Sequence, residues 1–210
     1  MPRRSVAPMP PRSDEPPRAW QRMLSGRRLD LLDPSPLDIE IEDIAHGLAR
    51  VARWNGQTVG SHAFSVAQHT LIVERIAEVT APALDAGGRL ALMLHDAPEY
   101  VIGDLISPFK ALLGGEYKAI EARLLAAIHR RFGVPSPLPA RVTAKIKEAD
   151  RISAYYEATR LAGFTEAEAA RYFGRPRDLD PDALDLDPWP AQKAEKRFLQ
   201  RFRILAAALG

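Results

Sequence analysis

The sequence predicts an all-α protein, a single helical bundle that follows an unstructured N-terminal tail. Three observations lead to that prediction. Apolar residues recur at spacings of three and four over most of the 210 residues, as they do on the buried face of a helix. Capping residues precede several of these stretches, and glycine or proline follows them. No segment shows the alternation of apolar and polar residues that is typical of half-buried strands.

The N-terminal tail is predicted from its composition. Residues 1–17 contain six prolines and almost no large apolar side chains, too little apolar surface to offset the entropy of an ordered chain. We therefore expect residues 1–27 to be a disordered, proline- and arginine-rich tail and residues 28–210 to form the domain. Within that domain, we expect a motif core at about 40–163 and a C-terminal helical extension at 164–210.

The elements of the bundle follow from periodicity and caps. Ser65 and Gln68 fit a capping box for the second helix. The segment 90–99 is apolar on every face, which indicates a central helix. Gly103 and Pro108 indicate a loop, and an Asp- and Pro-rich stretch at 174–190 indicates another. The predicted helices cover 40–52, 65–79, 90–99, 116–132, 139–162, a short stretch from 165, and 191–209.

Composition and charge narrow the class of protein. The chain has no cysteine, so disulfides, cysteine-ligated zinc and thiol nucleophiles are excluded. No apolar run approaches the length of a membrane span and no secretory signal is evident, so we expect a cytoplasmic protein with no membrane partner. Residues 1–28 hold seven arginines against two acids, whereas the remainder holds 22 basic and 25 acidic residues. The basicity therefore belongs to the tail, and we expect no nucleic-acid partner.

A group of metal-ligand residues falls in the most apolar segment. His95 is followed by Asp96, and Glu99 lies one helical turn further on, so the three could share one helix flank. Asp104 follows in the glycine-containing loop. One imidazole and three carboxylates suit a divalent metal ion, although a buried ion pair would also explain the His-Asp dipeptide alone.

Two further residues, His69 and Asp150, lie in other predicted helices, and together the set follows the order His, then His-Asp, then Asp. The chain resembles the HD superfamily of metal-dependent phosphohydrolases in this order of residues. The resemblance also extends to four segments of the sequence: RWNGQT, SVAQH, LMLHDAPEYVIGDLISPFK and EADR. The resemblance covers about residues 28–165 and is closest to small bacterial and phage nucleotide hydrolases.

The resemblance implies one divalent metal ion bound by His69, His95, Asp96 and Asp150. Manganese, cobalt, iron or magnesium would fit this nitrogen and oxygen donor set, and zinc is a further option. The helices that carry these residues would bring them together in the core of the bundle.

The resemblance also implies roles around the metal. Glu99 corresponds to the acid that activates water, and Asp104 to a second carboxylate that orients the water or a ribose hydroxyl. Arg53 corresponds to a phosphate-binding arginine, and Lys110 is a further candidate for phosphate contact. Trp54 could stack on the base or simply pack in the core.

The function that follows is hydrolysis of small nucleotides, with 5′-nucleotidase activity on deoxynucleoside monophosphates as the first expectation. A deoxynucleoside triphosphate triphosphohydrolase and a nucleotide-binding regulator with little turnover are the alternatives. The last helix, 191–209, is expected either to pack on the domain or to form a homo-oligomer. Of the other histidines, we expect His62 and His129 at the surface and assign no role to His46.

Overall fold

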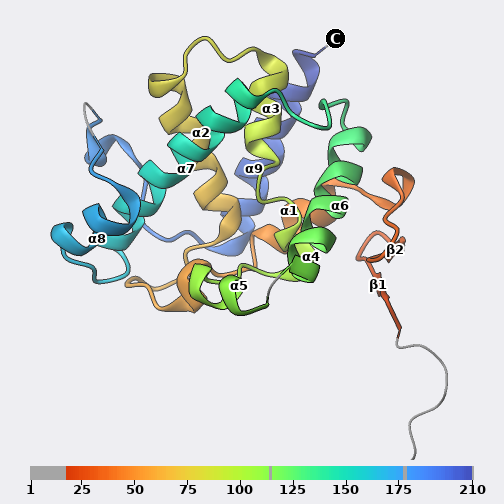
Figure 1. Ribbon diagram of the computed structural model, residues 1–210, viewed down its shortest axis with the longest axis horizontal. Coiled ribbons are helices and arrows are strands. Elements are labelled where there is room, and N and C mark those ends of the chain that lie inside the picture. The colour runs from red at the N-terminus through yellow and green to blue at the C-terminus, as the bar shows by residue number, and fades with distance from the viewer. Residues whose placement is uncertain (1–17, 114, 177–178, 210) are drawn as a thin grey trace, which may run out of the picture.

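The computed structural model describes residues 18–113, 115–176 and 179–209, and within these residues the protein is all-α, as predicted (Figure 1). Most of the predicted tail, residues 1–17, lies outside the described residues. The α-helices are α1 (Ile41–Leu48), α2 (Val66–Thr80), α3 (Ala86–Met93), α4 (Glu99–Ile102), α5 (Ser107–Leu113), α6 (Gly115–Arg131), α7 (Ala140–Arg160), α8 (Glu166–Phe173) and α9 (Ala191–Ala207). Short 3₁₀ helices lie at Pro36–Asp38, Arg53–Gly56 and Pro181–Ala183.

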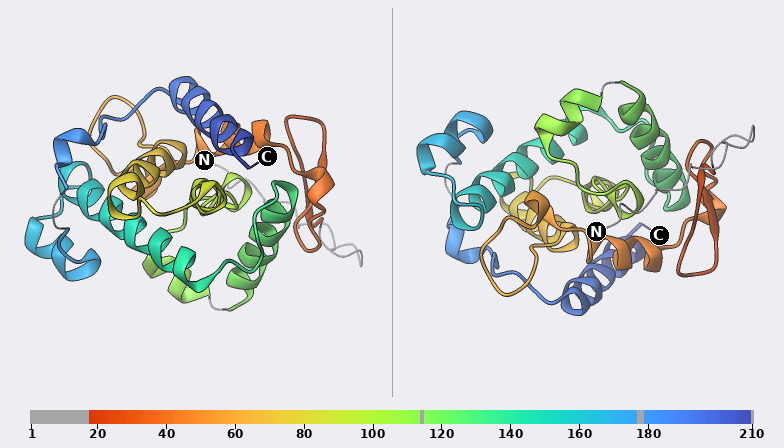
Figure 2. Two further views of the ribbon diagram at one scale, coloured as in Figure 1. Left: turned by 90° about the horizontal axis from the view of Figure 1, so that it is seen from above. Right: turned by 90° about the horizontal axis from the view of Figure 1, so that it is seen from below.

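Helix α3 lies in the middle of the bundle, surrounded by α2, α6, α7 and α9 (Figure 2). The run from Leu90 to Leu94 is completely buried, as the absence of a polar face predicted. Helix α2 contacts α7, α9 and α3, and α1 contacts α4 and α9. Helix α9 thus packs on the body of the bundle through Phe198, which is fully buried.

The predicted helix at 90–99 is wrong in its extent. Helix α3 begins earlier, at Ala86, because the Asp85 side chain accepts a hydrogen bond from the Gly88 amide at 2.8 Å. It ends at Met93, and a turn over residues 94–98 separates it from α4. Pro98 has no amide hydrogen to donate to the preceding turn, which accounts for the break. His95 and Asp96 therefore lie in a turn rather than on a helix.

Two other details of the helices differ from the prediction. Ser65 does cap α2, accepting a hydrogen bond from the Gln68 amide at 3.2 Å, but the capping box is not formed. The Gln68 side chain instead donates to the carbonyl oxygens of Asp185 and Asp187, because the 185–189 segment folds back over it. The loop predicted around Pro108 contains α5, in which this proline occupies the first turn.

A β-hairpin occupies part of the chain that was predicted to be disordered or free of strands. Strand β1 (Trp20–Arg22) pairs antiparallel with β2 (Arg28–Asp30), and Leu29 is fully buried. In the hairpin turn, Ser25 donates from its amide and its hydroxyl to the buried Asp43 of α1, at 2.9 and 2.5 Å. Residues 20–30 are ordered because of these long-range contacts, which the composition of the segment does not predict.

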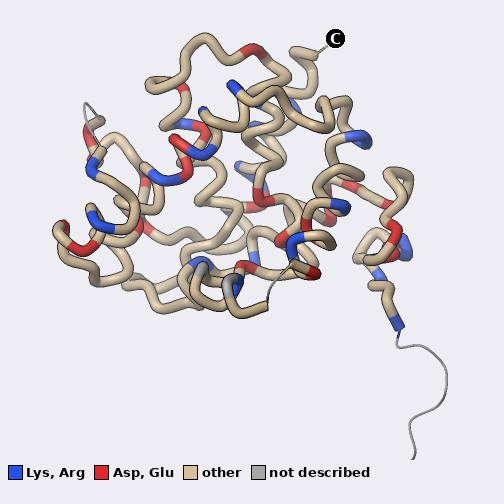
Figure 3. Tube along the Cα trace, viewed as in Figure 1, with Lys and Arg blue, Asp and Glu red and all other residues tan. Residues whose placement is uncertain are grey.

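His129 was predicted at the surface and is buried, with 3% of its surface exposed. It lies in the last turn of α6, where the chain turns back through Val134 against the helix. His62 is exposed, as expected. None of the helices in the described residues is long and apolar enough to cross a membrane. Acidic and basic residues are interspersed over the body in the view of Figure 3.

Candidate metal centre

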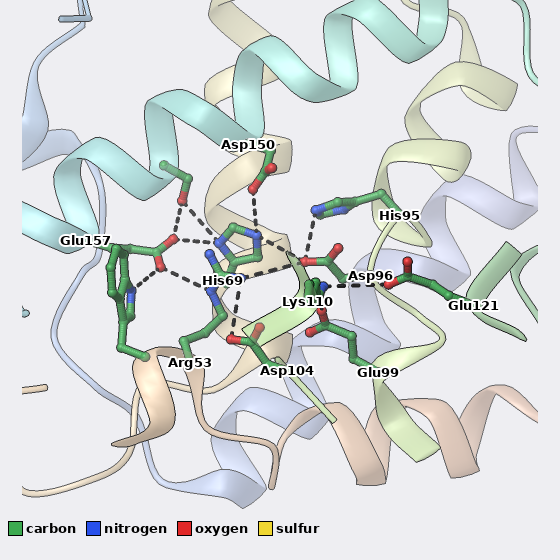
Figure 4. A network of polar contacts seen from close by, with 12 residues as sticks. Arg53, His69, His95, Asp96, Glu99, Asp104, Lys110, Glu121, Asp150 and Glu157 are labelled. Atoms are coloured by element: carbon green, nitrogen blue, oxygen red, sulfur yellow. Dashed lines mark hydrogen bonds and ion pairs between the residues drawn. The ribbon is translucent and has the colours of Figure 1, made fainter. Parts of the chain in front are cut away.

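Three parts of the chain bring the candidate ligands together. His69 lies one turn into α2, Asp150 lies in the middle of α7, and His95 and Asp96 lie in the turn between α3 and α4. Helices α2 and α7 pack along each other, so His69 and Asp150 face the same space, and the turn closes it from α3 (Figure 4). The break in the helix at Pro98 is thus part of how the site is built.

The ligand atoms are close to one another. His69 Nε2 lies 3.3 Å from Asp150 Oδ1 and 3.4 Å from Asp96 Oδ2. His95 Nε2 lies 3.2 Å from Asp96 Oδ2. Ligand atoms of His69, His95 and Asp150 all lie within 4.8 Å of one another, so a single ion could contact all three.

Each imidazole is held by its other nitrogen. His69 Nδ1 lies 2.5 Å from Glu157 Oε1, and His95 Nδ1 lies 2.8 Å from the Leu92 carbonyl oxygen. Both partners accept hydrogen bonds, so both Nδ1 atoms donate, and Nε2 is the nitrogen of each ring that could bind a metal ion. The two Nε2 atoms are buried and have no hydrogen-bond partner. Two oriented imidazoles with free Nε2 atoms beside two carboxylates match the donor set of a divalent metal site.

Electrostatics in the cluster favour a cation. Burial raises the pKa of Asp96, but the neighbouring His95 and His69 outweigh it and hold that pKa well below its usual range. Burial raises the pKa of Asp150, but the contact with His69 at 3.3 Å outweighs it and lowers that pKa. Both carboxylates therefore stay ionised, and their negative charge is directed at the Nε2 atoms.

The two candidate catalytic acids lie beside this cluster. Glu99, at the first position of α4, is 2% exposed, and its Oε1 lies 3.3 Å from Lys110 Nζ on α5. Burial, followed by the charges of Asp96 and Asp104, raises the pKa of Glu99 to about 9. Glu99 Oε2 is buried without a hydrogen-bond partner. Asp104 follows α4, and its side chain is 8% exposed.

Arg53 extends toward the same space from the short helix Arg53–Gly56. Its Nη1 lies 3.6 Å from Asp104 Oδ2 and 3.9 Å from Asp96 Oδ2. Its Nε donates to Glu157 Oε2 at 3.2 Å. The guanidinium thus lies beside the candidate ligands, held by carboxylates on two sides.

Trp54 lies away from the metal ligands, in an aromatic cluster. Its ring packs at 5.6 Å from Phe164 and 6.0 Å from Phe173, measured between ring centroids. Its indole nitrogen donates to Glu157 Oε2 at 2.8 Å. Trp54 and Asn55 both adopt left-handed backbone conformations, with φ of 56° and 51°. The packing and the hydrogen bond offset the cost of this backbone, which is about 1–3 kcal/mol for each such residue.

Two residues of the site were missed in the sequence. Glu157 and Ser153 lie on α7, and the Ser153 hydroxyl donates to Glu157 Oε1 at 2.7 Å. Burial raises the pKa of Glu157, but Arg53 and His69 outweigh it and lower that pKa far below its usual range. The sequence did contain a signal for these two residues, because positions 150, 153 and 157 have the i, i+3, i+7 spacing of one helix face. His46 lies outside the cluster, 3.5 Å from Glu195 on α9.

The fold and the site define an all-α protein with a histidine–aspartate cluster that could hold a metal ion. No protein-family model matches the chain. It is 54% identical over 192 residues to an uncharacterized protein of Rhodobacter capsulatus, an alignment that covers 91% of this chain and 98% of the relative. The chain therefore belongs to the same family as that protein.

Proposed function

We propose that this protein is an HD-type metal-dependent phosphohydrolase of small nucleotides, with deoxynucleoside monophosphates as the first candidate substrates. The observation that carries the proposal is the pair of buried, partnerless Nε2 atoms of His69 and His95. They face Asp96 and Asp150, and both imidazoles are oriented by hydrogen bonds at Nδ1. Two imidazole nitrogens that converge with two carboxylates, each imidazole being oriented through its other nitrogen, fit a metal site.

His69, His95, Asp96 and Asp150 would hold one divalent metal ion, with manganese, cobalt, iron or magnesium as the candidates and zinc as a further option. When bound, such an ion supplies Lewis-acid activation of water and of a phosphoryl oxygen. Nitrogen and oxygen donors can bind any of these metals, so the identity of the ion must be measured.

The remaining charged residues provide the other parts of a hydrolytic site. Glu99 Oε2, which has no hydrogen-bond partner, would accept the proton of the attacking water once a cation beside Asp96 and Asp104 lowers the raised pKa of Glu99. Arg53 faces the cluster and offsets the negative charge that develops on the phosphoryl oxygens. Lys110, which pairs with Glu99 at 3.3 Å, adds a second cation for the phosphate. Asp104 lies between Glu99 and Arg53 and orients the water or a sugar hydroxyl.

The test is a nucleotide panel on protein stripped with a chelator and reloaded with manganese, cobalt or magnesium. We expect orthophosphate release from at least one deoxynucleoside monophosphate, and loss of both metal and activity in Asp150→Ala. Glu99→Gln should retain the metal and lose about 10²–10⁴-fold in turnover, the usual contribution of a general base. Glu148→Ala is the matched control, because Glu148 lies on the same helix and pairs with Lys145.

Product identification separates the alternatives. Inorganic triphosphate in place of orthophosphate would show a triphosphohydrolase. Nucleotide binding without any product, in every metal form, would show a regulator. A wild-type protein that neither retains a transition metal nor releases phosphate would refute the proposal.

A further inference from the structure

Glu157 has a role in this site that the metal ligands alone do not explain. It is fully buried on α7, seven residues after Asp150, and its two carboxylate oxygens contact two different parts of the site. We propose that Glu157 is the positioning residue that holds His69 and Arg53 in their working orientations. This inference rests on the proposed function for the part played by Arg53.

The carboxylate of Glu157 accepts from four donors. Oε1 accepts from His69 Nδ1 at 2.5 Å and from the Ser153 hydroxyl at 2.7 Å. Oε2 accepts from Trp54 Nε1 at 2.8 Å and from Arg53 Nε at 3.2 Å. Only a group that accepts at both ends satisfies all four, and an ionised carboxylate is such a group.

The Oε1 contact orients the metal ligand. Because Nδ1 donates to Glu157, Nε2 is the His69 nitrogen available to a metal ion, and it faces Asp96 and Asp150. The side chain of His69 is completely buried, and Glu157 Oε1 is the acceptor that its Nδ1 meets at 2.5 Å. Carboxylates in this position typically change metal affinity by about 10–100-fold.

The Oε2 contact orients the arginine. The hydrogen bond from Nε fixes the plane of the Arg53 guanidinium, so Nη1 is directed at Asp104 and Asp96. One carboxylate therefore sets the position of the guanidinium relative to the metal ligand on α2. Figure 4 shows the carboxylate of Glu157 joined by dashed lines to both residues.

Glutamine has the same shape as glutamate but is unable to make these contacts. If its amide NH₂ faces His69, the imidazole must present its lone pair at Nδ1 and carry the proton on Nε2, the nitrogen needed for metal. If the NH₂ faces the other way, it meets the N–H groups of Arg53 and Trp54. The first orientation therefore puts the proton on the metal-binding nitrogen, and the second places donors against donors.

The experiment measures cobalt affinity by competition with a chelator, and the absorption spectrum of the cobalt-loaded protein. We expect Glu157→Gln to bind cobalt about 10–100-fold more weakly, with an altered spectrum. At saturating cobalt, its affinity for inorganic phosphate should fall about tenfold, the effect of one misplaced charged hydrogen bond.

Glu74→Gln is the matched control. Glu74 is also a buried glutamate, on α2 with His69, and it accepts hydrogen bonds from Arg89 and Arg201 rather than from the site. We expect this variant to lose stability and to retain wild-type cobalt affinity. If both variants weaken cobalt binding equally, the effect is merely structural and the inference fails.

A second variant keeps the test decisive if Glu157→Gln does not fold. Glu157→Asp retains the charge and withdraws both oxygens by one methylene, so cobalt affinity should again fall. Wild-type affinity in either variant would overturn the inference. Weaker cobalt binding in the variants, with no hydrolysis of nucleotides by the wild type, would support the positioning of His69 and refute the proposed hydrolase.

Discussion

At the scale of single residues, Glu99 has the environment with the clearest energetic consequence. It is buried beside Asp96 and Asp104, and burial followed by these two charges raises its pKa to about 9. Lys110 lies 3.3 Å away and opposes the shift without cancelling it. Between its unfolded pKa near 4.5 and about 9, the folded protein therefore holds a proton here that the unfolded chain releases.

This proton predicts how stability depends on pH in the metal-free protein. The stability due to Glu99 is fully present below pH 4.5 and is lost as the pH rises toward 9. Relative to Glu99→Gln, wild-type protein in chelator should lose up to about 1.4 kcal/mol per pH unit within this range. Urea unfolding at pH 5, 7 and 9 measures the difference. Glu121→Gln, which removes the other carboxylate near Lys110, should follow wild type. Parallel pH profiles for wild type and Glu99→Gln would contradict the expectation.

At the scale of elements, the contact between α1 and α4 fixes the position of α4. Glu99 lies in the first turn of α4 and is positioned with it. Gly47 of α1 lies directly against Tyr100 of α4. A Cβ atom at Gly47 would lie 2.8 Å from Tyr100 Cβ and 2.9 Å from its carbonyl oxygen, both closer than real contacts. The glycine is therefore needed for close approach of the two helices, although it is a poor helix former.

Gly47→Ala should destabilise the protein by about 1–3 kcal/mol, because overpacking outweighs the better helix propensity of alanine, about 1 kcal/mol. Gly87→Ala in α3 is the control, since a Cβ there would make ordinary contacts at 3.6 and 3.7 Å. We expect this control to be neutral or slightly stabilising. Midpoints of urea unfolding compare the two, and a Gly47→Ala protein as stable as wild type would contradict the close packing of α1 on α4.

At the scale of the whole molecule, the candidate ligands join parts of the chain that are distant in sequence. His69 lies in α2, His95 in the turn before α4, and Asp150 in α7. An ion bound by all three would exist only in the folded protein, so its binding energy would add to the stability of the fold.

Metal should therefore raise the melting temperature. At about 100 times its dissociation constant, manganese or cobalt should stabilise the protein by about 2.7 kcal/mol, or about 5–10 °C for a chain of this size. His95→Ala should abolish the shift, and a chelator should reverse it in wild type. His62→Ala, at an exposed histidine, should leave the shift unchanged. An equal shift in His95→Ala would place the metal elsewhere.

The sequence alone determined what depends on neighbouring residues. The three- and four-residue spacing gave most of the helices, because one face of a helix must be apolar to be buried. The order of His69, His95-Asp96 and Asp150, through its resemblance to a known family, predicted the group of residues that the structure brings together.

The tertiary structure decided what depends on contacts between distant segments. It placed His95 and Asp96 in a turn, ordered the hairpin through Asp43, and directed Glu157 at both His69 and Arg53. Local patterns carry no information about which donors will meet an acceptor across a helix interface. Those pairings arise only when α2, α7 and the segment around Arg53 pack together and exclude water, so that each buried polar group requires a partner.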